Sequence, residues 1–159
     1  MNGYTGHTLW VDLTRSTISV KPTDREMAKK VVGGRGLGIA LLTELAPAGV
    51  DPLAPENPLI LATGPYTGAG VFSAFFNVTT KSPLTGLAAA SHCGGKWGPG
   101  FKRAGFDALV VTGAAERPCY LVLEEGRAAL MVLATDRPVP DAVQADIGAV
   151  AGVVSVAAL

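Results

Sequence analysis

One short segment, residues 91–98 with the sequence SHCGGKWG, concentrates the residue types that could do chemistry. Successive glycine amides that lead into a helix form a concave set of N–H donors, which can bind a phosphate or a polar heterocycle. His92 and Cys93 place two polar side chains beside Gly94 and Gly95. The pattern predicts a turn that binds an anion or a heterocycle, and the alternative is a glycine-rich turn that serves only the path of the chain.

Nucleophilic and metal chemistry find less support in the same residues. A Cys–His pair must lie within hydrogen-bond reach, whereas adjacent residues of an extended segment point to opposite faces. The chain has two cysteines, Cys93 and Cys119, too few for a disulfide framework or a site of four thiolates. Paired carboxylates and a catalytic triad are also missing from the sequence. We therefore assign no catalytic residue and no metal ligand.

A second glycine run, GGRGLG at residues 33–38, superficially resembles a dinucleotide-binding loop. Such a loop follows a strand and opens a helix. Here the run follows a predicted helix, so we interpret its glycines as the close contact between two helices. Asp107, in the later segment AGFDA, could orient a loop, and nothing in its surroundings predicts a catalytic role.

The composition sets limits on the partners of this chain. The 159 residues carry 13 basic and 13 acidic side chains, so no net charge points to nucleic acid or to an anionic membrane. Charged residues make up 16%, below the roughly 25% of an average soluble domain. This indicates a surface covered by another domain, a subunit or a large cofactor, or else a genome biased toward alanine and glycine. With neither a signal peptide nor a membrane-spanning run, the cytoplasm is the expected compartment.

Alternation and turn residues predict an α+β fold of mainly antiparallel sheets with a few short helices. A capping box, Thr23 with Glu26, should start the first helix. After residue 107 we expect a strand meander, and the apolar end of the chain looks cut inside a core element. The expected strands are 7–13, 17–21, 59–64, 75–81, 107–113, 118–125, 127–134 and 153–159, and the expected helices are 24–32, one from Gly36 to near Pro47, 96–104 and 141–148.

A series of short motifs occurs in one order along residues 3–135. The series includes Gly34-Arg35-Gly36-Leu37, Val50-Asp51-Pro52-Leu53, Ala62-Thr63-Gly64-Pro65, Asn77-Val78, Thr80-Lys81-Ser82-Pro83-Leu84-Thr85-Gly86, Gly94-Gly95 and Ala104-Gly105-Phe106-Asp107-Ala108. Together they resemble the N-terminal domain of the aldehyde:ferredoxin oxidoreductase family, the tungsten- or molybdenum-pterin enzymes. On this resemblance, residues 1–159 form one such domain, incomplete at the C-terminus.

The resemblance implies a set of cofactor contacts. In the family this domain is the base on which a bis-pterin (molybdopterin-type) cofactor with tungsten or molybdenum lies. The cofactor-binding residues that it implies here are Asn77, His92, Cys93, Gly94 and Gly95. An asparagine stands at the position of His92 in the family. Phe75 occupies a position where the family has a basic residue near the cofactor phosphates, so this contact departs from the family pattern.

The resemblance also implies a function for a larger assembly. Aldehyde would be oxidised to carboxylic acid, and electrons would pass to ferredoxin through a [4Fe–4S] cluster whose cysteines lie outside this chain. The chain alone should be inactive and should need its remaining domains or a separate catalytic subunit. The alternative is a non-catalytic remnant or interaction domain that keeps the scaffold without binding cofactor, which Phe75 and the missing second pterin segment favour.

Overall fold

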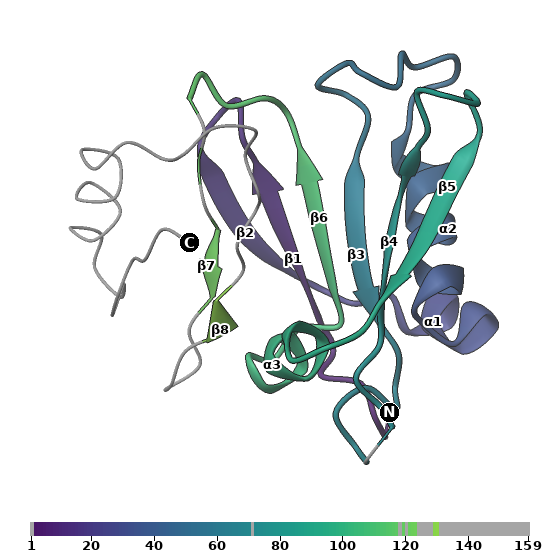
Figure 1. The fold of residues 1–159 in the computed structure, drawn as a ribbon, viewed down its shortest axis with the longest axis vertical. Coiled ribbons are helices and arrows are strands. Elements are labelled where there is room, and N and C mark those ends of the chain that lie inside the picture. The colour runs from purple at the N-terminus through teal and green to yellow at the C-terminus, as the bar shows by residue number, and fades with distance from the viewer. Residues whose placement is uncertain (1, 71, 118, 120, 124–128, 131–159) are drawn as a thin grey trace.

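The computed structural model describes residues 2–70, 72–117, 119, 121–123 and 129–130. Their main feature is a six-stranded sheet in the order β2-β1-β6-β3-β4-β5 (Figure 1). All neighbouring strands are antiparallel except β1 and β6. The predicted α+β class is confirmed. The strands are β1 (His7–Asp12), β2 (Thr17–Pro22), β3 (Leu59–Thr63), β4 (Phe76–Lys81), β5 (Ala88–Cys93), β6 (Ala108–Thr112), β7 (Val122–Leu123) and β8 (Ala129–Leu130), and the helices are α1 (Arg25–Val31), α2 (Arg35–Leu45) and α3 (Trp97–Arg103).

The central position of β6 corrects the predicted meander. This strand lies between β1 and β3, whereas β7 pairs with β8 in a separate two-stranded sheet. Ala108, Leu109 and Val110 are completely buried, and a continuous apolar run of this kind suits a strand covered on both faces. The exposed strand β2 instead forms one edge of the sheet. Turn residues between apolar runs therefore do not show which strands pair.

Two apolar clusters cover the two faces of the sheet. On one face, Leu37 and Leu41 of α2 pack with Ile60 of β3 and Val110 of β6. On the other face, Phe101 of α3 belongs to a cluster that also contains Leu9, Val11, Leu61, Leu109 and Leu121. The alternation of side chains along each strand produces this division. In Figure 1, α1 and α2 lie behind the β3–β5 half of the sheet.

The first helix begins with a different cap from the predicted one. The side chain of Asp24 accepts hydrogen bonds from the amides of Glu26 and Met27, at 2.8 and 3.0 Å. Thr23 is buried instead, and its hydroxyl lies 3.0 Å from that of Thr8. The capping box was therefore wrong by one residue. Either side chain could cap a helix, and the polar partners of Thr23 decide between them.

Among the remaining predicted elements, one strand was missed and several segments lie partly or wholly outside the described residues. Strand β5 was not expected, because its sequence AAASHC lacks large β-branched residues. The predicted segments 141–148 and 153–159 lie outside the described residues, as do parts of 118–125 and 127–134. In the part of the chain that the structure describes, no helix has the length and apolar character of a membrane span.

Candidate functional site

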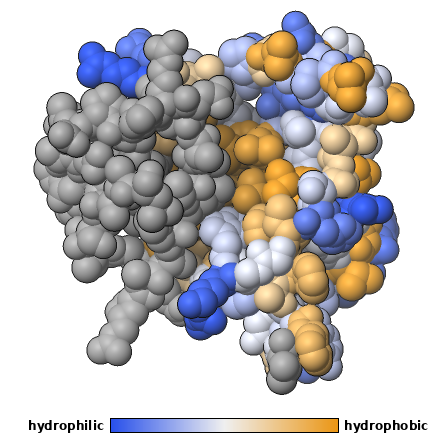
Figure 2. Space-filling view, in the orientation of Figure 1, coloured by the Kyte–Doolittle hydropathy of each residue, from blue (hydrophilic) through white to orange (hydrophobic). Residues whose placement is uncertain are grey.

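A cavity of about 520 Å³ opens at the end of the sheet where β3 ends and β4 begins. Its walls come from the α1–α2 linker, the β3–β4 loop and the adjoining strands, and we call it the main cavity. Hydrophobic atoms are exposed at the bottom of the view in Figure 2, where the β3–β4 loop lies in Figure 1. The lining residues are Val32, Gly33, Gly34, Arg35, Gly64, Pro65, Tyr66, Thr67, Phe72, Ser73, Phe75, Phe76, Asn77 and His92.

The α1–α2 linker forms one wall because glycine lets it approach the end of β3. An added Cβ at Gly33, which has a φ of +152°, would lie 2.9 Å from the main-chain oxygen of Thr63. The Gly34 amide donates to that same oxygen at 3.0 Å. The interpretation of this run as a helix–helix contact was therefore incomplete. Gly36 does lie against Val31 of α1, but Gly33 and Gly34 line the main cavity.

Asn77 and His92 are brought together because β4 and β5 pair. The two residues are directly opposite in the antiparallel register, which places their side chains on the same face. Asn77 is completely buried. Its amide donates to the Ser91 oxygen at 2.8 Å and accepts from the Thr79 hydroxyl at 2.6 Å. Both ends of this amide are thus occupied within the sheet, whereas His92 is exposed.

The other three predicted site residues lie beside the main cavity and do not line it. Cys93 ends β5 and is partly exposed. An added Cβ at Gly94 would lie 3.5 Å from the ring of Phe75, which does line the cavity. Gly95 has a φ of +99° and turns the chain toward α3. Cofactor contacts by these residues remain a prediction.

The remaining walls are largely aromatic. Tyr66, Phe72 and Phe75 are 78%, 92% and 59% exposed, which is unusual for large aromatic side chains. The polar side chains that meet at the cavity are Arg35 and His92, whose Nη2 and Nδ1 atoms are 3.4 Å apart. Sequence reasoning missed Arg35 as a site residue, because only the fold brings the start of α2 beside β5.

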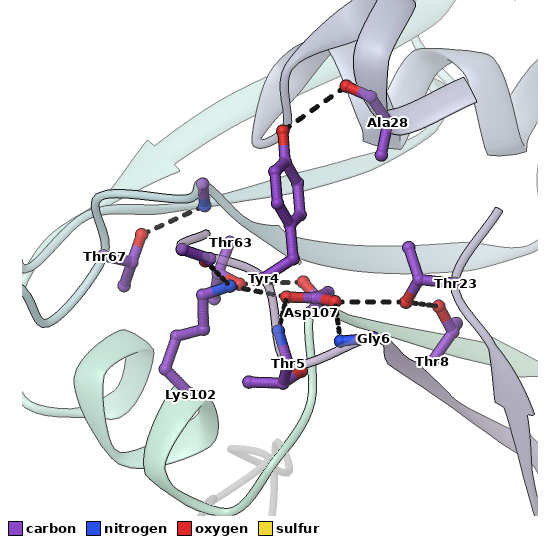
Figure 3. A network of polar contacts seen from close by, with 12 residues as sticks. Tyr4, Thr5, Gly6, Thr8, Thr23, Ala28, Thr63, Thr67, Lys102 and Asp107 are labelled. Carbon is purple, nitrogen blue, oxygen red and sulfur yellow. Dashed lines mark hydrogen bonds and ion pairs between the residues drawn. The ribbon is translucent and has the colours of Figure 1, made fainter. Parts of the chain in front are cut away.

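A buried polar network connects the N-terminal segment with the end of β3 and with Asp107, directly before β6 (Figure 3). The Asp107 carboxylate accepts hydrogen bonds from the amides of Thr5 and Gly6, at 3.0 and 2.7 Å, and from the Thr23 hydroxyl at 3.2 Å. It also pairs with the Lys102 ammonium at 2.5 Å. Burial alone would raise the pKa of Asp107, but the hydrogen bonds from Lys102 and the two amides outweigh it and lower this pKa. A charged carboxylate therefore holds the N-terminal segment in place.

This network is connected to the cavity wall through the N-terminal segment. The Tyr4 hydroxyl donates to the main-chain oxygen of Val32, a lining residue. The Lys102 ammonium also donates to the Gly3 oxygen at 2.8 Å. From the sequence, Asp107 could orient a loop, and in the structure its carboxylate accepts hydrogen bonds from the amides of Thr5 and Gly6. The number of donors around it was not evident from the sequence.

The sequence that forms this site matches a known protein family. Residues 8–137 match the family described as "Aldehyde ferredoxin oxidoreductase, N-terminal domain". Over 126 residues the chain is 45% identical to the tungsten-containing aldehyde ferredoxin oxidoreductase of Pyrococcus furiosus, with 79% of this chain and 21% of the relative covered. Identity to the aliphatic sulfonate oxidoreductase, WOR-like subunit, of the same organism is 37% over 128 residues, which covers 77% of this chain and 20% of that relative.

A solved structure has the same fold. The active-site complex BamBC of benzoyl-coenzyme A reductase, in complex with 1,5-dienoyl-CoA, gives a TM-score of 0.70 at 36% identity, covering 76% of this chain and 18% of that chain. This chain thus spans about a fifth of the length of the relatives it matches. The family match extends over most of the chain and includes the walls of the main cavity. The chain therefore belongs to the aldehyde ferredoxin oxidoreductase family, as its N-terminal domain.

Proposed function

We propose that the main cavity binds a pterin of a tungsten cofactor, and that this chain is the cofactor-binding N-terminal portion of an enzyme that oxidises an aldehyde to a carboxylic acid. The observation that carries the proposal is the meeting of His92, which lies opposite the buried Asn77, with three exposed aromatic rings in one cavity. Its volume of about 520 Å³ is in the range of small-molecule sites. The tungsten-containing relatives add support.

The residues present fit a flat heterocycle better than a bare metal ion. Aromatic side chains offer faces on which a ring can stack. Within the described ranges, no group of three or more His, Cys, Asp or Glu side chains could hold a metal ion. Tungsten would therefore be held through the ligands that the cofactor itself carries. The cofactor would supply the redox chemistry, and the residues of this chain would bind and orient it.

The proposal assigns the remaining parts of the reaction to other segments or subunits. Two cysteines cannot hold a [4Fe–4S] cluster of four thiolates. The cluster, the ferredoxin contact and the second pterin would lie outside this chain, and the chain alone would be inactive. The relatives are about five times longer than the matched segment, which leaves room for such parts. The expected compartment is the cytoplasm.

The binding proposal is testable on the chain itself. Titration with 6-hydroxymethylpterin, followed by the fluorescence anisotropy of the pterin, should show saturable binding. Tyr66→Ala combined with Phe75→Ala should weaken binding by about thirtyfold or more, because each lost stacking contact contributes roughly 1–3 kcal/mol. Leu84→Ala with Leu87→Ala is the matched control, since these large apolar side chains are at least as exposed and do not line the cavity. Equal affinities in all three proteins would contradict binding in the main cavity.

A second candidate function is an interaction domain that keeps the scaffold without cofactor. The observation in its favour is Phe75, an aromatic ring at the cavity that cannot donate a hydrogen bond to an anion. Co-purification with the product of the adjacent gene, followed by tungsten, molybdenum and pterin analysis, separates the two. Recovery of metal and pterin supports the enzyme. A complex that forms without either supports the interaction domain.

A further inference from the structure

Arg35 is the fixed positive charge at the main cavity. It is the first residue of α2, and its exposed side chain lines the cavity. The described lining residues include no other Lys or Arg and no Asp or Glu. Among the described residues, no carboxylate forms an ion pair with Arg35. The guanidinium therefore faces an open cavity without a competing anion.

Among the described residues, His92 is the side chain that contacts the Arg35 guanidinium. A guanidinium can only donate hydrogen bonds, so the contact of 3.4 Å makes His92 Nδ1 the acceptor. In the neutral imidazole the proton is then on Nε2. The other N–H groups of Arg35 remain available, because none of them has a protein partner within the described residues.

The neighbouring hydroxyls have little capacity left for a ligand. Thr67 Oγ1 accepts from the Gly64 amide at 3.0 Å and donates to the Phe75 oxygen at 2.9 Å. Ser73 Oγ is bonded to both the amide and the oxygen of Gly70. The charged group available for binding an anion at the cavity is therefore Arg35, with His92 and the Tyr66 hydroxyl as the neighbouring polar groups.

We propose that Arg35, held by His92, binds a phosphate group of the ligand in the main cavity. The planar guanidinium matches a phosphate with two parallel hydrogen bonds, which an ammonium cannot do. The aromatic walls would meanwhile contact the ring that carries the phosphate. The identity of the ring as a pterin rests on the proposed function. The phosphate-binding site at Arg35 does not depend on that function. Arg35 would also supply a positive charge at the cavity, which the aromatic ring of Phe75 cannot supply.

The test compares 6-hydroxymethylpterin, its phosphate ester and inorganic pyrophosphate as probes of the full chain. The ester should bind more tightly than the unphosphorylated pterin. Arg35→Gln should weaken ester binding about tenfold, the usual value of a charge-assisted hydrogen bond, and should weaken the unphosphorylated pterin less. Arg35→Lys should recover only part of the loss. Arg103→Gln, an exposed arginine of α3, is the matched control and should bind all probes like the parent chain.

A separate substitution tests whether His92 positions Arg35. His92→Phe keeps an aromatic ring but removes the acceptor, so it should weaken the ester less than Arg35→Gln does. In the double variant the two losses should not add, because both act through the same guanidinium. Additive losses would overturn the positioning role. Circular dichroism of each variant checks that the fold is kept.

The outcomes separate this inference from the proposed function. If both pterins bind equally and Arg35→Gln has no effect, the phosphate site is overturned and pterin binding stands. If neither pterin binds while pyrophosphate binds in an Arg35-dependent way, the anion site stands and the pterin proposal fails. If pyrophosphate binding is also absent, or is unchanged in Arg35→Gln, both fail. Displacement of pyrophosphate by inorganic phosphate would identify a site for the free anion.

Discussion

At the scale of single residues, Asp107 is the group on which the buried polar contacts converge. Two amides, one hydroxyl and one ammonium donate to a carboxylate that is completely buried. Its main-chain oxygen also accepts from the amide and the hydroxyl of Thr63, the last residue of β3. One residue therefore connects the N-terminal segment, α3 and β3, and it fixes the end of the sheet where the main cavity opens.

Asp107→Asn should lower the free energy of unfolding by about 3–5 kcal/mol, because it leaves the buried Lys102 ammonium without its partner. The new NH2 group would also face the amides of Thr5 or Gly6, which are donors themselves. Urea denaturation followed by circular dichroism measures the change. Asp12→Asn is the control, since the ion pair of Asp12 with Arg15 is at the surface and should contribute little. Similar losses in the two variants would contradict the role of Asp107.

Acid should destabilise the fold through the same carboxylate. The pKa of Asp107 is lowered in the folded chain, compared with about 3.9 in an unfolded chain. The unfolded state therefore binds the proton more readily, so the stabilisation is fully present above the unfolded pKa. It is lost as the pH falls through the folded pKa. Urea midpoints should decline below about pH 4, and less steeply in Asp107→Asn than in the parent chain. Parallel declines would show that other carboxylates dominate.

At the scale of elements, the contact of α2 with β4 determines how the cavity wall is placed. Gly38 lies on the buried side of α2, and an added Cβ would overlap the side chain of Thr79. Thr79 in turn donates to the buried Asn77. A glycine here lets the helix approach the strand closely, and this closeness brings Arg35 at the start of α2 near His92.

Gly38→Val should therefore push α2 away from the sheet. We expect a loss of about 1–3 kcal/mol from overpacking, seen as a lower thermal midpoint, together with weaker Arg35-dependent binding of pyrophosphate. Gly70→Val is the matched control, because no atom lies within 4 Å of the added Cβ at that loop position. An unchanged midpoint in Gly38→Val would mean that α2 can shift without cost.

Local patterns in the sequence predict most elements but not their neighbours. The β1–β2 hairpin, both helices that follow, β3 and β4 were predicted to within a few residues, because apolar spacing and caps are local signals. Strand β5 was missed, since its small side chains carry no such signal. His92 and Asn77 were chosen through the family resemblance, whereas Arg35 enters the site only when α2 packs on β4 and β5.

At the scale of the whole molecule, the sheet formed by the described residues consists of two parts that β6 joins. The β2–β1 hairpin comes from the start of the chain, and the β3–β4–β5 unit comes from its middle. Strand β6 pairs with β1 on one side and with β3 on the other. Both apolar clusters contain residues of β6, namely Leu109 in one and Ala108 and Val110 in the other. We therefore expect that neither part buries its apolar faces fully until this later strand is in place.

A chain shortened to residues 1–105 should consequently fail to form the sheet, although it contains five of the six strands. A synthetic peptide of residues 106–116 should restore it by inserting as β6, because the vacant position offers hydrogen bonds on both edges and apolar contacts on both faces. Amide dispersion in NMR spectra of the shortened chain, with and without peptide, measures this. A peptide of the same composition in scrambled order is the control. Native-like dispersion without any peptide would show that the two parts fold independently, and β6 would then be an addition to a finished sheet.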